Sequence, residues 1–312
     1  MPTLAKALDQ TPWLRPRLLW AAVAVVSLGL AAALVAVAGQ AWMGPRPDFA
    51  NRTGRPQRPA ETGLLLAGSG SNIDLLQLVA ADCAATHPGF AVWLDAGMGS
   101  TGGLRALRDG VVDAAMVSRP LRADEVDGRA VRVDYARSPV AFAAHPGVLH
   151  PGVTTPQIVA LYRGETTTWP DGIRAVVVQR ERGDSSHLAV DRVLAGFAAA
   201  NQQAWQSGRW RVVYSDRAMS EALLATPGAV GLVDVSATVA ANQPLRLLRL
   251  DGVAPDPSAV QAGTYSLYKD HALVLPSGLQ GAAQVLMACL GSAAGRGRIA
   301  SVRAMPLLGP WP

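Results

Sequence analysis

Lysine and cysteine are scarce in this chain, and the dense basic runs typical of nucleic-acid-binding proteins are missing. Lys6 and Lys269 are the only lysines among 312 residues, so nearly all of the basic residues are arginines. The formal net charge is +5. Because no basic run is interleaved with aromatic residues, we expect no nucleic-acid partner. Abundant alanine, glycine and valine accompany the arginine bias, which points to codon composition as its source.

Sequence signatures of catalysis, metal binding and nucleotide binding are also missing. The five histidines show no metal-ligand spacing. Ser186 and His187 are neighbours in sequence, which is no basis for a catalytic triad. The chain has no P-loop Gly-Lys-Ser/Thr, and residues 68–73 lack the third glycine of a dinucleotide loop. We therefore expect no enzymatic activity, no catalytic residues, no cofactor and no metal.

Residues 18–38 form an uncharged and almost wholly apolar segment near the N-terminus. At 1.5 Å per residue they would span roughly 30 Å, about one bilayer core. We expect a transmembrane helix at residues 18–38, a cytoplasmic tail at residues 1–17 and a flexible linker at residues 39–62, which are rich in Pro, Arg and Gly. A cleaved signal sequence is the alternative. Either interpretation exports the rest of the chain.

The two cysteines, Cys83 and Cys289, belong to no metal-type cluster in the sequence. Export would permit a disulfide between them. Both lie in predicted apolar helices, which favours two separate buried thiols.

From residue 63 onward, short apolar runs of strand length alternate with helical patterns. A first run predicts strands at residues 64–67, 91–95 and 114–117, with helices at 73–86 and 104–108. A second run predicts strands at residues 140–144, 175–178, 210–213 and 230–233, with helices at 156–162, 188–199 and 218–224. Further strands are expected at residues 245–250, 265–268 and 272–275, and a long helix at 278–290. Such alternation is typical of an α/β fold with a parallel sheet.

Three turns rich in glycine and serine each follow a predicted strand and begin a helix. They are residues 68–72 (GSGSN), 97–103 (GMGSTGG) and 179–187 (QRERGDSSH). A helix N-terminus offers free N–H groups and the positive end of the helix dipole, both of which suit an anion. The third turn also contains Arg180. The pattern predicts one anion held by several helix N-termini.

These turns belong to a longer series of motifs between about residues 64 and 291. The other members are residues 113–121 (DAAMVSRPL), 157–164 (QIVALYRG), 169–172 (WPDG) and 226–231 (TPGAVG). In order and spacing the series resembles the phosphate-binding proteins of the periplasmic substrate-binding superfamily, the soluble receptors of phosphate ABC transporters. The resemblance implies an α/β, two-domain periplasmic-binding-protein-like fold with a ligand cleft between the domains. Residues 63–142 and 266–312 would form domain 1, and residues 143–265 domain 2.

The resemblance also implies which residues face the ligand. By position these are Ser71, Asn72, Ile73, Ser100, Thr101, Ser118, Arg180, Asp184, Ser185 and Ser186. Small residues let backbone N–H groups approach an oxyanion, hydroxyls add donors, and arginine adds a charge-assisted contact. Three alternatives stay open: helix capping for Ser100 and Ser118, packing for Ile73, and a surface ion pair with Glu181 or Asp184 for Arg180.

The chain departs from the family's pattern in two loops. Ser118 stands where the third loop often has an aspartate that accepts a proton from phosphate. In the fourth loop, Asp184 and Ser185 replace the usual serine and glycine. A carboxylate facing a dianion is costly unless it accepts a hydrogen bond from a protonated oxygen of the anion or pairs with arginine. One hypothesis is that Asp184 rejects sulfate by repulsion; the other is that it turns outward and caps the helix beginning near Ser186.

The implied function is that of an extracytoplasmic binding protein. It would capture inorganic phosphate or a similar oxyanion and serve a membrane partner such as an ABC transporter permease. It would act as a monomer on the periplasmic side of the inner membrane, anchored by its N-terminal helix or released by signal cleavage. The alternative is an interaction or sensor module that keeps the fold without tight anion binding.

Overall fold

The computed structural model describes residues 63–95, 98–125, 128–278 and 280–309, all within the compact unit formed by residues 56–312. The expected tail at residues 1–17, the helix or signal sequence at 18–38 and the linker at 39–62 lie outside the described residues and stay predictions. Within the described ranges, no helix combines the length and the apolar character needed to cross a membrane.

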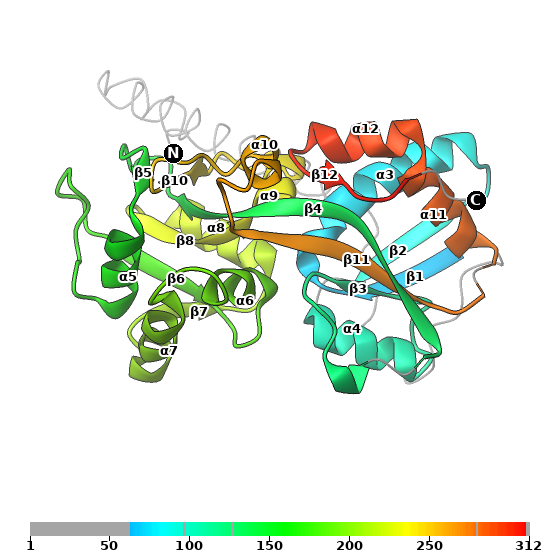
Figure 1. Cartoon of the computed structure of the whole chain (residues 1–312), viewed down its shortest axis with the longest axis horizontal. Coiled ribbons are helices and arrows are strands. Elements are labelled where there is room, and N and C mark those ends of the chain that lie inside the picture. The colour runs from blue at the N-terminus through cyan, green and yellow to red at the C-terminus, as the bar shows by residue number, and fades with distance from the viewer. Residues whose placement is uncertain (1–62, 96–97, 126–127, 279, 310–312) are drawn as a thin grey trace, which may run out of the picture. The chain divides into compact units, whose positions relative to one another are not determined.

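The first α/β region is built on three parallel strands with helices on both faces (Figure 1). Its elements are β1 (Gly63–Gly68), β2 (Ala91–Asp95), β3 (Ala114–Val117), η2 (Gly70–Asn72), α3 (Ile73–Thr86), α4 (Gly99–Arg108), α11 (Ala282–Gly291) and α12 (Ala293–Ser301). Side chains alternate across a strand, so Leu66 packs with Leu75 of α3 and Leu286 of α11, while Ala67 packs with Ala106 of α4. Strands buried on both faces explain the continuous apolar runs in the sequence.

The second α/β region has the same plan. Its elements are β6 (Val176–Arg180), β7 (Arg211–Val213), β8 (Ala229–Asp234), α5 (Thr155–Arg163), α6 (Ser185–Asp191), α7 (Phe197–Ser207), α8 (Asp216–Ala225), α9 (Val235–Ala240) and α10 (Pro257–Gln261), with short strands β5 (Gly152–Val153), β9 (Arg246–Leu247) and β10 (Arg249–Leu250). One face packs around the rings of Phe142, Tyr162 and Phe197, whose centroids lie 4.6–6.3 Å apart. Met219 and Leu223 of α8 cover the other face.

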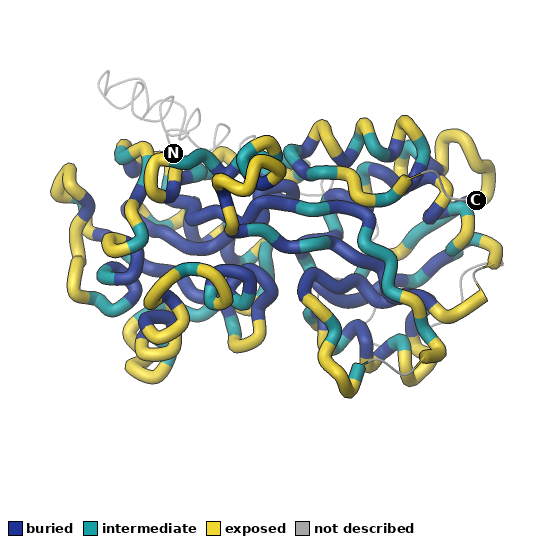
Figure 2. The backbone as a smooth tube through the Cα atoms, in the orientation of Figure 1, coloured by how far each residue is buried: buried dark blue, intermediate teal, exposed yellow. Residues whose placement is uncertain are grey.

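Two strands pass from one region to the other, β4 (Ala130–Ala144) and β11 (Tyr268–Pro276). Residues 130–139 of β4 pair with β11 in antiparallel register, and residues 140–144 pair with β8. The hydrogen-bonded order β2-β1-β3-β11-β4-β8-β6-β7 therefore runs without a break through β4, and the short β12 (Met305–Pro306) pairs with residues 136–137 of β4. Figure 2 shows that the backbone of β4 is buried over most of this passage. The sheet is mixed, and the predicted domain limits of 63–142 with 266–312 and 143–265 stay a prediction.

Cys83 and Cys289 form a disulfide, so the prediction of two separate thiols is wrong. Cys83 lies on α3 and Cys289 on α11, two helices that pack together over the first region. Their Cα atoms are 5.8 Å apart, within the range that a disulfide requires. The residues are 206 positions apart in sequence, so only the tertiary fold makes them neighbours.

Candidate functional site

Lys269 on β11 places its ammonium group among three serine hydroxyls. Its Nζ donates to Ser71 Oγ at 2.7 Å, to Ser186 Oγ at 2.8 Å and to Ser185 Oγ at 3.2 Å. An ammonium has three N–H donors, so each donor of Lys269 has a serine hydroxyl as its acceptor. Ser71 lies in η2, and the other two serines form the first turn of α6. We call Lys269 with these three residues the serine cluster, and it brings together the first and fourth expected loops.

Asp234, the last residue of β8, places a carboxylate beside the cluster. Its Oδ2 lies 3.5 Å from Lys269 Nζ and 3.1 Å from His271 Nε2, while Oδ1 accepts hydrogen bonds from two serine hydroxyls. Burial raises the pKa of Asp234, but the charges of His271 and Lys269 outweigh it and hold the pKa well below its usual range. The carboxylate is therefore ionised and stabilises positive charge at Lys269.

Ser118, which follows β3, is the centre of a second hydrogen-bonded group. Its Oγ accepts from Asn72 Nδ2 at 2.7 Å and lies 3.3 Å from His271 Nδ1, and its N–H donates to Ser100 Oγ at 3.3 Å. Tyr135 fixes Asn72 by donating to its Oδ1 at 2.8 Å. The first, second and third expected loops therefore meet at Ser118.

Two further expected residues have other partners. Thr101 Oγ1 accepts a hydrogen bond from Arg119 at 2.8 Å. The N–H of Ile73 donates to Gly70 O, and its side chain packs against the core of the first region. The packing alternative thus describes Ile73, because the one group that was expected to touch ligand is already bonded.

Three carboxylates surround the buried guanidinium of Arg180, at the end of β6. Nε and Nη2 donate to Glu181 at 2.9 and 3.0 Å, and Nη1 lies 3.0 Å from Asp216 Oδ1 and 3.4 Å from Asp184 Oδ2. Burial alone would lower the pKa of Arg180, but the carboxylates of Asp216, Asp184 and Glu181 raise it above its ordinary value. The ion pairs offered as an alternative are present, but the guanidinium and Asp184 are buried and Glu181 is only partly exposed, so they are not surface pairs.

Asp184 is the N-cap of α6. Its Oδ1 accepts from the N–H groups of Ser186 and His187 at 3.1 and 3.0 Å, and it lies 3.0 Å from His187 Nδ1. Burial raises the pKa of Asp184, while Arg180, His187 and Lys269 hold it well below its usual range. Asp184 therefore caps α6, as one hypothesis held. The same hypothesis expected its side chain to turn outward, which is wrong, since Asp184 is only 6% exposed. A sulfate-repelling role loses its geometric basis because both oxygens have partners.

Negative charge exceeds positive charge around the cluster. Ser71 Oγ donates to Asp216 Oδ1 at 3.3 Å, which links the cluster to the carboxylates around Arg180. Burial, together with the charges of Asp216 and Asp234, raises the pKa of Asp74 in the first turn of α3. An anion bound here must therefore be balanced by Lys269 or carry a proton of its own.

Sequence reasoning missed Lys269, His271, Asp216 and Asp234. A signal for two of them was present: Lys269 and His271 are charged or titratable residues between the apolar runs predicted as strands at 265–268 and 272–275, and the structure includes both in β11. Being two positions apart, they point to the same face of β11. The local sequence gives no sign that Asp216 and Asp234 belong to the site, because aspartate is common at the start of a helix.

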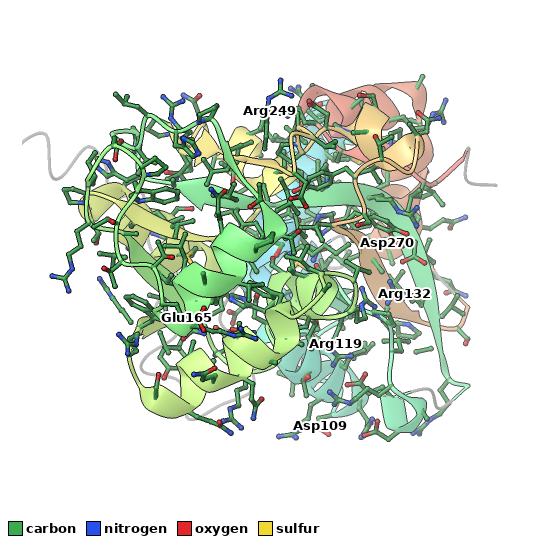
Figure 3. All side chains as sticks on the ribbon, turned by 60° about the vertical axis from the view of Figure 1, so that its left-hand side comes forward. Asp109, Arg119, Arg132, Glu165, Arg249 and Asp270 are labelled. Atoms are coloured by element: carbon green, nitrogen blue, oxygen red, sulfur yellow. A yellow bond between two sulfur atoms is a disulfide. The ribbon has the colours of Figure 1, made fainter. Side chains whose placement is uncertain are left out.

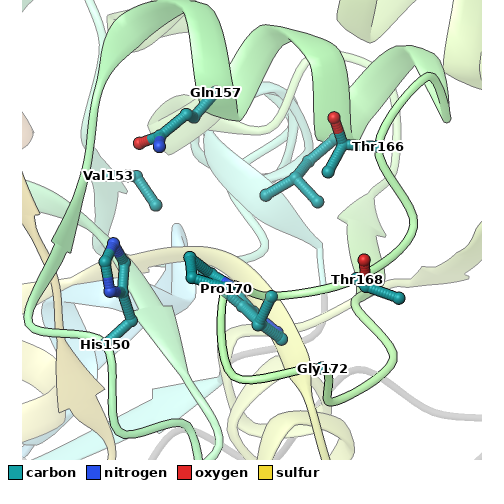
Figure 4. Close-up of a pocket in the computed structure, with 9 residues that line it drawn as sticks. His150, Val153, Gln157, Thr166, Thr168, Pro170 and Gly172 are labelled. Carbon is teal, nitrogen blue, oxygen red and sulfur yellow. The ribbon is translucent and has the colours of Figure 1, made fainter.

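Two cavities differ in chemistry. One of about 340 Å³ is lined by Ser118 and Lys269 together with Arg119, Arg132, Arg137 and Arg192. Three of its lining residues, Arg119, Arg132 and Asp270, are labelled in Figure 3. The other, of about 430 Å³, is lined by residues between His150 and Gly172 beside α5, and it contains no Asp, Glu, Lys or Arg (Figure 4). The smaller, basic cavity adjoins the serine cluster and suits an anion.

Comparisons with known proteins agree with this architecture. The sequence pattern of the PBP superfamily domain matches residues 53–287. A Clostridium perfringens substrate-binding protein, assigned to phosphate ABC transport and solved with bound phosphate, is similar with a TM-score of 0.68 and 19% identity, covering 78% of this chain and 99% of that one. A Vibrio cholerae ABC-type phosphate transport receptor gives a TM-score of 0.56 and 20% identity, with 78% and 99% coverage.

Reduced OxyR from Neisseria meningitidis also shares the fold, with a TM-score of 0.53, 13% identity and 79% and 99% coverage. No curated protein sequence matches the chain. At these identities the structural likeness establishes the fold, and ligands must be argued from the site. The match over residues 53–287 shows that the chain belongs to the PBP superfamily, and its fold is the α/β periplasmic-binding-protein-like fold with a mixed sheet.

Proposed function

We propose that this chain is an extracytoplasmic solute-binding protein that captures phosphate or a related oxyanion. It would deliver the anion, or signal its presence, to a membrane partner such as an ABC transporter permease. The observation that carries the proposal is the ammonium of Lys269 among the hydroxyls of Ser71, Ser185 and Ser186. Two solved relatives by fold support it, one solved with bound phosphate and one a phosphate transport receptor.

Donors for an anion remain available around the cluster. Ser185 and Ser186 accept from Lys269, and their own O–H groups have no acceptor among the described residues. Met98, the N-cap of α4, makes no side-chain cap hydrogen bond, which leaves backbone N–H groups at the N-terminus of this helix. Oxyanion oxygens placed between these donors would receive hydrogen bonds and the charge of Lys269.

The proposed ligand residues are accordingly Ser71, Asn72, Ser100, Thr101, Ser118, Ser185 and Ser186, with Lys269 added. Arg180 and Asp184 act through their neighbours, since Arg180 is held by three carboxylates and Asp184 caps α6. The surplus of carboxylates favours an oxyanion that keeps a proton near neutral pH, as phosphate does and sulfate does not.

Binding would be coupled to closure of two domains. The cluster draws Ser71 from the first α/β region and Ser185 and Ser186 from the second, with Lys269 on a connecting strand. An anion that touches all of them binds the closed arrangement better than an open one, and so shifts the equilibrium toward it. A partner would read that closed state. The proposed setting is the periplasmic side of the inner membrane, with residues 18–38 as anchor or cleaved signal and the protein monomeric.

A second candidate function is an interaction or sensor module without tight anion binding. Two observations favour it. All three N–H donors of Lys269 are already hydrogen-bonded to serines, and carboxylates surround Arg180. In that case the internal ammonium would hold the two regions together without any ligand.

Calorimetric titration of the full-length chain with phosphate, arsenate, molybdate and sulfate separates the two candidates. The lead proposal expects phosphate and arsenate to bind and sulfate to bind far more weakly. A folded protein that takes up none of the four anions would leave the second candidate. Absence of phosphatase activity is expected in parallel and is checked with a chromogenic phosphate monoester.

A further inference from the structure

The basic cavity beside the serine cluster is larger than a single phosphate group requires. Its volume is about 340 Å³, whereas a water molecule occupies roughly 30 Å³ of liquid. Pockets of about 300 Å³ and above are typical of sites for small organic ligands. Ser118 and Lys269 belong both to the cavity wall and to the hydrogen-bonded groups described above, so the two spaces adjoin.

Four arginines from three parts of the fold line this cavity. Arg119 follows β3, Arg132 and Arg137 lie on β4, and Arg192 is the C-cap of α6. Asp270 is the only carboxylate in the wall, and it makes a bidentate pair with Arg137 at 2.6 and 3.0 Å. The wall therefore carries more positive than negative charge, in contrast to the serine cluster.

Three of these arginines already have acidic partners. Arg119 is paired with Glu125 at 2.7 Å, Arg132 with Asp134 at 2.6 Å, and Arg137 with Asp270. Arg192 is exposed, and its side chain makes no hydrogen bond or ion pair within the described part of the chain. It is thus the arginine in the wall that is free to bind a ligand, because the charges of the other three are balanced by their acidic partners.

We propose that this cavity is a second anion subsite, and that the ligand is a phosphorylated compound with a second anionic group. The inference rests on the proposed function: the first phosphoryl group lies at the serine cluster, and the second anionic group contacts Arg192. Arginine favours such groups because its planar donors match phosphate or carboxylate oxygens in pairs. A ligand of this kind would use both the buried cluster and the exposed cavity.

The test is calorimetry of the full-length chain with orthophosphate and pyrophosphate, the simplest probe with two phosphoryl groups. Wild-type protein should bind pyrophosphate at least about tenfold more tightly than orthophosphate. Arg192→Ala should lower the pyrophosphate-to-orthophosphate affinity ratio by about ten- to a hundredfold, as expected for lost hydrogen bonds to a charged group. Arg249→Ala is the matched control, because Arg249 is an exposed arginine outside the cavity (Figure 3).

The possible failures are distinguishable. Orthophosphate binding without any preference for pyrophosphate would overturn the second subsite and leave the proposed function standing. An unchanged ratio in Arg192→Ala, or an equal drop in Arg249→Ala, would also overturn it. A folded protein that binds neither anion would overturn both the subsite and the proposed function.

Discussion

Lys269→Met removes the positive charge from the serine cluster while keeping an unbranched side chain of similar length. The variant loses three hydrogen bonds, from Nζ to Ser71, Ser185 and Ser186, of 2.7 to 3.2 Å. It also leaves Asp234 Oδ2 with only His271 at ion-pair distance, 3.1 Å away. The change therefore affects both the proposed anion site and a buried charge pair.

The two effects have different magnitudes. Truncating one side of a buried, hydrogen-bonded charge contact weakens binding by about 2–5 kcal/mol. We expect about 2–4 kcal/mol here, because the hydroxyls and helix N-termini remain, and this corresponds to a roughly 30- to 1,000-fold increase in the Kd for phosphate. Stability should fall as well, by up to about 3–5 kcal/mol, since Asp234 is left as a poorly compensated buried charge.

A double variant separates binding from folding. In Lys269→Met/Asp234→Asn neither charge remains, so the free energy of unfolding should recover toward that of wild type while phosphate affinity stays low. Calorimetry measures the affinities, and urea titration measures the free energies of unfolding. Wild-type phosphate affinity in folded Lys269→Met would refute the role given to this residue.

Three further outcomes are expected. Replacing Cys83 and Cys289 by serine should lower the free energy of unfolding by about 3–5 kcal/mol in denaturant titrations, because the bridge closes a 206-residue loop. A hydrogen bond from Arg119 lowers the pKa of Glu125 to about 2, so the stability that wild type gains over Glu125→Gln should be full above about pH 4.5 and decline in melts toward about pH 2. Asp184→Asn should leave the ratio of sulfate to phosphate affinity unchanged in calorimetry, since Asp184 caps α6; a raised ratio would restore the repulsion hypothesis.

Local sequence patterns predicted the α/β alternation well. They failed where tertiary contacts determine the bounds of a strand or helix. Only residues 140–144 were predicted as a strand, whereas β4 spans Ala130–Ala144. The missed part, residues 130–139, contains Arg132, Asp134 and Arg137, whose charges interrupt the apolar pattern. In the fold these side chains pair with each other or with Asp270, so the strand tolerates them.

A single long helix was expected at residues 188–199, and the structure has two helices there. α6 ends at Asp191 and α7 begins at Phe197. Gly196 precedes α7 with φ of 76°, a left-handed conformation that ends regular helix and favours glycine. The apolar period continues across this break, so periodicity alone could not locate it.

The candidate site, like the fold, was predicted only in part from the sequence. Its loops follow from local glycine and serine patterns, and the structure brings Ser71, Ser185 and Ser186 together around Lys269. Lys269 lies 198 positions from Ser71 and 83 from Ser186, and only the crossing of β11 between the two regions delivers it. The sequence marks Lys269 as a charged residue beside apolar runs, but the contact with these serines depends on long-range strand pairing, so its place in the site was not predicted.

A crystal structure of the full-length chain with phosphate tests the central claim most directly. The account predicts a phosphate whose oxygens lie within hydrogen-bond distance of Lys269 Nζ and of the hydroxyls of Ser185 and Ser186, with at least one serine contact of the ammonium replaced by phosphate. Phosphate bound elsewhere, with Lys269 still held by all three serines, would contradict the account.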